Sequence, residues 1–207
     1  MNDGPYPSKW LERAVDELAQ LPGVGRKTAL RLALHLLRQP RERAISLGQS
    51  LIDMRENCGY CERCHNISDT PLCSICSSPE REQSVVCVVE NVRDVLAIER
   101  TYQYKGLYHV LGGVISALDG TGPHNLEIES LIERVRTEQI KEVILAISST
   151  VDGETTCYYI YRKLKDLPVL VTQLSRGIAV GDELEYIDEI TLAQALHDRR
   201  QMSGAVS

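Results

Sequence analysis

The sequence predicts a multi-domain chain of the α+β and α/β classes, in which helices, a cysteine-rich loop and a parallel sheet follow one another. Three observations predict this order. Apolar residues repeat at helical spacing as far as about residue 55. Five of the seven cysteines then fall between Cys58 and Cys76, in a segment without periodicity. From Ser84 onward, β-branched runs alternate with helical patterns, which is typical of a largely parallel sheet covered by helices.

The N-terminal region is predicted to hold three helices. They are expected over residues 8–20, 26–38 and 42–55. Ser8 can cap the first helix, because its side chain can accept a hydrogen bond from an otherwise unpaired backbone amide. Leu21-Pro22-Gly23-Val24-Gly25 interrupts the pattern between the first two helices, and Pro40 ends the second.

Four sheet strands, a fifth short strand in the tail and four further helices are predicted after the cysteines. The strands are expected at Val85–Val89, Leu107–Leu111, Val143–Ile147 and Val169–Val171. Three helices are expected over 92–102, 125–138 and 155–165, and the tail is expected to form a strand at Leu184–Ile187 and a helix from Thr191. The predicted domains are a helical domain (1–56), a cysteine segment (57–80), an α/β domain (81–170) and a C-terminal strand–helix segment (171–207). We assign oligomerisation to the last segment as a hypothesis.

Composition indicates a folded protein without a membrane-spanning segment. The chain is 43% hydrophobic and 25% charged, and it has no apolar run of about 18 residues. The first residues, Met1 to Ser8, lack the basic start and apolar stretch of a signal peptide. We therefore expect a cytoplasmic protein with no membrane partner.

The charge is unevenly distributed along the chain. A formal net charge of −6 argues against a nonspecific nucleic-acid binder. Between Gln20 and Arg43, however, six bases stand against the single acid Glu42. These bases are Arg26, Lys27, Arg31, Arg38, Arg41 and Arg43. A local basic patch on an acidic protein predicts one defined DNA-contacting region.

The glycine hairpin between the first two helices carries the first functional motif. Gly23 and Gly25 allow a tight turn and close approach of a ligand, and the amides at the start of the next helix can donate to a phosphate. Lys27 and Arg31 lie four residues apart, hence on one helical face, where they can hold neighbouring phosphates. The alternative is a plain turn between two helices with a solvated basic face. The phrase resembles the helix-hairpin-helix motif of DNA-binding proteins, and it lacks the spacing of a nucleotide-binding P-loop.

The clustered cysteines predict a structural zinc site. In a reducing compartment such cysteines are metal ligands rather than disulfide partners. Two sets of four ligands fit: the first is Cys58, Cys61, Cys73 and Cys76, and the second is Cys61, Cys64, Cys73 and Cys76. Either set gives a closed tetrahedral site, so spacing alone favours neither. Unmetallated thiols, or His65 in place of one thiolate, are the remaining alternatives.

A third motif follows the first predicted strand of the sheet. Glu90 lies at the end of that strand, where α/β sheets place their ligands. It resembles the glutamate of the Toprim domain, the metal-binding fold of topoisomerases and primases. A working Toprim site also needs an Asp-x-Asp pair after a later strand, and here Ser148 and Thr150 take those places. Because two hydroxyls cannot replace two carboxylates as magnesium ligands, we expect no phosphoryl-transfer chemistry, and a helix-capping or partner-binding role for Glu90.

The order of these motifs resembles the RecR family of bacterial recombination mediators over nearly the whole chain. The phrases that carry the resemblance are Leu21-Pro22-Gly23-Val24-Gly25, the cysteine block, Cys87-Val88-Val89-Glu90, Leu118-Asp119-Gly120-x-Gly122-Pro123, Glu142-Val143-Ile144-Leu145-Ala146 and Gly181-x-Glu183-Leu184-Glu185. The resemblance implies a Cys-x2-Cys-x8-Cys-x2-Cys zinc site, which only Cys61, Cys64, Cys73 and Cys76 satisfy, leaving Cys58 as an extra thiol. It also favours Lys27 and Arg31 as DNA-contacting bases. One departure is Ala179, where the family pattern has a proline, and we expect it to be tolerated.

The resemblance implies a non-enzymatic role in DNA repair. Members of the family assemble as rings, typically tetramers, that can encircle DNA, both single- and double-stranded. They act with RecO and RecF to place RecA on single strands coated by single-strand-binding protein. Glu90 and Asp94 would lie on the partner-binding side. The alternative is a magnesium-dependent Toprim nuclease, primase or topoisomerase-like enzyme that uses Glu90, Asp119 and Asp152.

Overall fold

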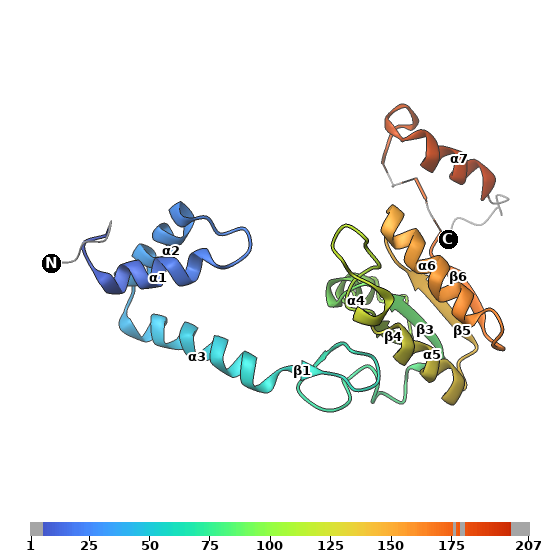
Figure 1. Ribbon diagram of the computed structural model, residues 1–207, viewed down its shortest axis with the longest axis horizontal. Coiled ribbons are helices and arrows are strands. Elements are labelled where there is room, and N and C mark those ends of the chain that lie inside the picture. The colour runs from blue at the N-terminus through green and yellow to red at the C-terminus, as the bar shows by residue number, and fades with distance from the viewer. Residues whose placement is uncertain (1–5, 176, 179–180, 200–207) are drawn as a thin grey trace. The chain divides into compact units, whose positions relative to one another are not determined.

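The structure is a computed structural model that describes residues 6–175, 177–178 and 181–199. The chain divides into two compact units, Met1–Cys58 and Gly59–Ser207 (Figure 1). Each unit has its own core, and the division places the four cysteines that follow Cys58 with the sheet. Among the described residues, no helix is long and apolar enough to cross a membrane.

The first unit consists of three helices. They are α1 (Lys9–Ala19), α2 (Arg26–Arg38) and α3 (Arg41–Asn57), each within two residues of its predicted bounds. Ser8 caps α1 as predicted, and its hydroxyl oxygen accepts a hydrogen bond of 3.3 Å from the Trp10 amide. Val15 of α1 and Ala29 and Ala33 of α2 form the buried core, where the two alanines allow close approach of the helices. No residue of α3 is buried within this chain.

A small hairpin opens the second unit. Strands β1 (Gly59–Tyr60) and β2 (Ile67–Ser68) pair antiparallel, with Gly59 opposite Ser68. The sequence predicted an irregular loop here, because strands of two residues are too short to show an alternating pattern.

The main sheet has four parallel strands in the order β4-β3-β5-β6 (Figure 1). The strands are β3 (Glu82–Val89), β4 (Gly106–Val110), β5 (Glu142–Ala146) and β6 (Leu170–Gln173). The helices between them are α4 (Val92–Glu99), the short 3-10 turn η1 (Pro123–Asn125), α5 (Ile128–Thr137) and α6 (Val151–Leu164). The prediction of a parallel sheet with interleaved helices is confirmed.

Alternate residues of β3 face opposite layers of the fold. Val86 and Val88 belong to the larger core with residues of α5 and α6. Cys87 and Val89 belong to a second core with Val95 of α4. Both faces of the central strand are therefore buried, which explains its unbroken apolar run. Cys87 is a small buried residue, and burial raises the pKa of its thiol to about 12.

Several predicted elements differ from the structure. Helix α4 ends at Glu99 and α5 begins at Ile128, each three residues short of its predicted bound, and β3 begins three residues earlier than predicted, at Glu82. Helix α6 begins at Val151, four residues earlier than predicted, because Thr150 caps it by accepting from the Gly153 amide at 3.1 Å. The strand predicted at Leu184–Ile187 is wrong: Leu184–Tyr186 forms a 3-10 helix, η2, and the segment belongs to neither sheet of the described chain. Helix α7 (Glu189–His197) follows, capped by Asp188. Ala179 lies outside the described residues.

Candidate zinc centre and nucleic-acid interface

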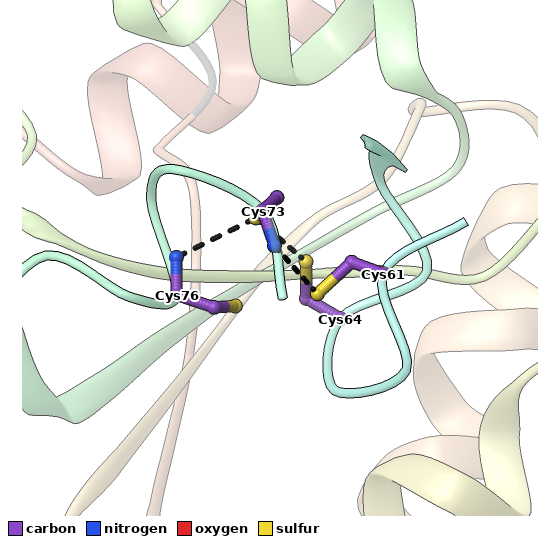
Figure 2. A group of neighbouring side chains, drawn as sticks. All are labelled: Cys61, Cys64, Cys73 and Cys76. Atoms are coloured by element: carbon purple, nitrogen blue, oxygen red, sulfur yellow. Dashed lines mark hydrogen bonds between the residues drawn. The ribbon is translucent and has the colours of Figure 1, made fainter. Parts of the chain in front are cut away.

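Four cysteines of the second unit converge on one point. One sulfur from each of Cys61, Cys64, Cys73 and Cys76 lies within 4.8 Å of the others, and all four residues are buried. Figure 2 shows the first pair approaching from the β1–β2 hairpin and the second pair from the turn that follows. The Cys73 amide donates to the Cys61 sulfur at 3.3 Å, and the Cys76 amide donates to the Cys73 sulfur at 3.4 Å.

The backbone holds each pair of cysteines on a tight turn. After Cys64 the chain reverses at His65, whose φ of +60° is in the left-handed region. The His65 amide donates to the Cys61 carbonyl at 2.9 Å, which closes this turn. The Ser77 amide donates to the Cys73 carbonyl at 3.0 Å and closes the second. Two such turns present four sulfurs in the arrangement of a structural metal site.

This donor set fits zinc. Four sulfurs complete a tetrahedral shell and leave no position for a substrate, which gives a structural rather than a catalytic ion. A hydrogen bond to Cys76 and burial hold the pKa of Cys64 well above its usual value. Hydrogen bonds from the Cys64, Cys73 and Cys61 side chains lower the pKa of Cys76 to about 6. A bound cation would stabilise all four as thiolates.

Cys58 and His65 are not members of this group. Cys58 is the C-terminal cap residue of α3, where its amide donates to the Met54 carbonyl at 2.9 Å. The His65 ring packs edge-on against His109, with centroids 5.2 Å apart, and its Nε2 lies 3.5 Å from a Glu127 carboxylate oxygen. The structure thus brings together the second of the two predicted ligand sets.

Arg63 anchors the cysteine turns to the sheet domain. Its guanidinium makes two hydrogen bonds to the Glu138 carboxylate, of 3.0 and 2.7 Å, and a third to the Cys76 carbonyl at 3.3 Å. The Cys64 carbonyl in turn accepts from the Val110 amide at 2.8 Å, at the end of β4. The cysteine segment is therefore fixed to the α/β domain by a backbone hydrogen bond and by the Arg63–Glu138 ion pair.

Arg134 of α5 places a buried positive charge near the cysteines. Only 5% of the residue is exposed. Its Nε donates to Glu138 at 3.1 Å and its Nη1 to the Tyr108 carbonyl at 2.8 Å, while the buried Nη2 has no hydrogen-bond partner among the described residues. Its charge contributes to the lowered pKa of Cys76, after the hydrogen bonds from Cys64.

The strand-end site contains the residues that the sequence predicted, without a carboxylate cluster. Glu90, at the end of β3, accepts a hydrogen bond of 2.6 Å from the Ser148 amide. The Ser148 and Thr150 hydroxyls lie 3.1 Å apart beside it. Among the described residues, the four cysteines are the only group of three or more potential metal ligands gathered together. Asp119 and Asp152 therefore do not join Glu90 in such a group.

Asp94 serves its own helix. Its carboxylate accepts from the Asn91 amide at 3.0 Å, and the two side chains form a capping box at the start of α4. The sequence interpretation offered the capping role to Glu90. Instead Asn91 is the N-cap and Asp94 completes the capping box, while the Glu90 carboxylate reaches across to the loop before α6.

The glycine hairpin of the first unit is built as predicted. Gly23 has a φ of +79°, a conformation that favours glycine, and the Val24 amide donates to the Leu21 carbonyl at 3.0 Å. Gly25 is the N-cap of α2 and supplies no side-chain acceptor to the first amides of the helix. Lys27 and Arg31 are exposed, and no described residue forms an ion pair with either.

Comparison with known proteins assigns the chain to a family. Four family models match in succession: the helix-hairpin-helix of RecR over 11–55, the four-cysteine zinc finger domain of RecR over 59–78, the Toprim domain over 84–175 and the C-terminal region of RecR over 177–200. The "Recombination protein RecR" of Porphyromonas gingivalis is 59% identical over 97% of both chains. The chain belongs to the RecR family. Proteins of the same name from Bacteroides thetaiotaomicron and Flavobacterium psychrophilum are 57% and 55% identical over at least 94% of each chain.

Membership of the RecR family identifies the cysteine group as a zinc site. The zinc finger match spans residues 59–78, which contain four cysteines and exclude Cys58. These four are the same residues whose sulfurs converge in the structure. The predicted zinc cofactor is therefore confirmed.

Sequence reasoning missed the residues that surround the zinc site in this RecR chain. Arg63 lies between Cys61 and Cys64, whereas Arg134 and Glu138 come more than 50 residues after Cys76, and all three resemble ordinary surface charges of a turn or helix. A useful signal was the spacing of Arg134 and Glu138, four residues apart on a predicted helix. Nothing in the sequence indicated that Arg63 reaches the same carboxylate.

Proposed function

We propose that this chain is a DNA-binding recombination mediator that acts in DNA repair without catalysing a reaction. The observation that carries the proposal is the glycine hairpin beside two exposed cations that no described residue neutralises. In the same chain, the Toprim-type strand ends hold one carboxylate beside two hydroxyls. The relatives named "Recombination protein RecR" support the recombination role.

DNA contact is proposed for the hairpin. Gly23 and Gly25 let the backbone approach a phosphate closely, and the open amides at the start of α2 can donate to it. Lys27 and Arg31 would hold neighbouring phosphates on the same strand. Such contacts carry no sequence preference, which suits a protein that must act at any damaged site.

The partner assignments extend this proposal. From the family resemblance, we propose that the chain forms a ring, typically a tetramer, around single- or double-stranded DNA in the cytoplasm. With RecO and RecF it would place RecA on strands coated by single-strand-binding protein. The half-buried Glu90 and the neighbouring Asp94 support a partner surface at the strand ends, because both add negative charge there.

Charge reversal tests the DNA assignment. The double variant Lys27→Glu, Arg31→Glu should lose binding to a fluorescent oligonucleotide in low salt, because a phosphate-driven interaction depends on cations. Its zinc content and circular dichroism spectrum should match the wild type, since both side chains are exposed. Binding that stays at the wild-type level would refute the assignment.

The Toprim match favours a second candidate function, a magnesium-dependent nuclease, primase or topoisomerase-like enzyme. Glu90 would then be its central metal ligand. A cleavage assay with magnesium decides between the two candidates, with Glu90→Ala as the control. We expect no cleavage from either protein, and activity present in the wild type but lost in the variant would establish the enzyme.

A further inference from the structure

Helix α2 carries a row of four basic side chains that extends well beyond the hairpin. Lys27, Arg31 and His35 follow one another at intervals of four residues, and Arg38 comes three residues later. Residues at these intervals share one face of an α-helix. We call Lys27, Arg31, His35 and Arg38 the α2 track.

The α2 track faces away from the core of its unit. Ala29 and Ala33 are the buried residues of α2. Arg31 stands two residues from each of them, and at about 100° per residue it points to the opposite side of the helix. Lys27, Arg31, His35 and Arg38 are accordingly all exposed.

The sign of the charge along this face is uniform. From Arg26 to Arg38 the helix contains no Asp or Glu. Arg26, which lies outside the track, is paired with Asp16 of α1 at 2.9 Å, whereas no described residue forms an ion pair with Lys27, Arg31 or Arg38. A face that is merely solvated usually mixes both signs, as α1 and α3 do. An unneutralised row of one sign indicates a polyanionic ligand.

The surface between the cations is mostly apolar. A groove on this helix is lined by the four track residues together with Thr28, Leu30 and Leu34. Cations beside an apolar floor suit a nucleic-acid strand, whose phosphates need positive charge and whose sugars and bases need nonpolar contact. A free phosphate ion would need only one end of the groove.

We propose that the DNA path continues from the hairpin along the whole α2 track, so that Arg38 and His35 bind backbone phosphates of the same strand as Lys27 and Arg31. This proposal rests on the proposed function and extends it. The track rises over about eleven residues, which is about 16 Å at about 1.5 Å per residue. At about 3.4 Å per nucleotide, that length matches about five nucleotides of a stacked strand.

The salt dependence of binding tests the track. Binding of a fluorescent oligothymidylate to the full chain is measured by anisotropy over a series of sodium chloride concentrations. Arg38→Gln should weaken binding and lower the slope of log K against log salt by about 0.7, the share of one phosphate contact on a single strand. Arg38→Lys should keep the slope, because the charge remains.

Arg13→Gln is the matched control. Arg13 is an exposed arginine of α1 outside the track, so its loss changes the net charge equally and should leave the slope unchanged. If Arg38→Gln keeps the wild-type slope while Lys27→Glu, Arg31→Glu abolishes binding, the path ends at Arg31 and this proposal fails alone. If the double variant also binds normally, the DNA assignment itself fails.

Discussion

Arg63 of the zinc finger holds Glu138 of the sheet domain through two hydrogen bonds, of 3.0 and 2.7 Å. The same carboxylate accepts from Arg134 at 3.1 Å, so one acid serves two arginines. The side chains of Arg63 and Glu138 are about three-quarters buried, with 23% and 28% exposed. Partial burial makes this pair more than a surface ion pair, because its charges are only partly hydrated.

Substitution of Arg63 and substitution of Glu138 should each lower the free energy of unfolding, and the two losses should differ in size. We expect a loss of about 1.5–3 kcal/mol for Arg63→Ala, the range for a hydrogen bond to a charged group. Glu138→Gln should cost more, since it leaves the buried Arg134 without its counter-charge. Urea unfolding of both single variants and the double variant measures the coupling. Arg136→Ala, an exposed neighbour on α5, serves as control, and equal losses in all three single variants would contradict the role of the pair.

The zinc ligands can be separated from the extra thiol by substitution. Cys64→Ser should lose zinc and destabilise the second unit, because its turns have little apolar core besides the four cysteines. Cys58→Ser should retain one zinc ion per chain, since Cys58 lies outside the sulfur group. Metal analysis of the purified proteins gives the answer directly, and the reverse pattern would select the ligand set that contains Cys58.

Arg134 should affect how firmly zinc is held. A zinc ion with four thiolates carries a net negative charge, and Arg134 provides a buried positive charge nearby, with one nitrogen that lacks a partner among the described residues. Arg134→Met should therefore release zinc more readily to a competing chelator, by about 10- to 100-fold, the usual effect of residues around a metal site. Arg134→Lys should recover part of the loss.

The exposed Arg136 provides the comparison for that experiment. Arg136 lies two residues after Arg134 on the same helix, and Arg136→Met also removes one positive charge, but from the surface. We expect its zinc release to match the wild type. Equal release from Arg134→Met and the wild type would mean that the buried guanidinium serves packing alone.

The sequence predicted most elements because their patterns are local. The run Val85–Val89 indicates a strand buried on both faces, and the residues around Gly23 indicate a hairpin, without reference to any distant segment. The strand predicted at Leu184–Ile187 failed for the opposite reason. A strand needs a partner, and the alternation of apolar residues cannot reveal that none is present among the described residues.

The candidate site divides in the same way. Cys-x2-Cys pairs are recognisable by their spacing, so the candidate ligands followed from the sequence, although spacing alone left two sets open. The contact between Glu90 and Ser148 joins two strand ends, and parallel pairing made it foreseeable. Arg63, Arg134 and Glu138 meet only after the finger folds onto α5. Long-range pairs of this kind leave no periodic pattern in the sequence.

A second ion pair should make the sheet domain sensitive to acid. A hydrogen bond from Arg81, together with one from the Tyr108 hydroxyl at 2.7 Å, lowers the pKa of Glu99 below its ordinary value of 4.5. A carboxyl whose pKa is lowered by folding stabilises the folded state above its unfolded pKa. That stabilisation is lost as the pH falls from about 4.5 through the folded value.

Glu99→Gln should therefore make the melting temperature of the protein depend less on pH in the acid range. The variant should unfold at a lower temperature than the wild type near neutral pH, because the ionised partner of Arg81 is gone. The gap between the two melting temperatures should narrow as the pH falls below about 4.5, where the wild-type carboxylate is also being neutralised. Zinc loss in acid affects both proteins alike and cancels in the difference. Glu133→Gln, an exposed carboxyl on α5, should show no such convergence. A difference in melting temperature that stays constant across this pH range would show that Glu99 stabilises the fold by packing rather than by its charge.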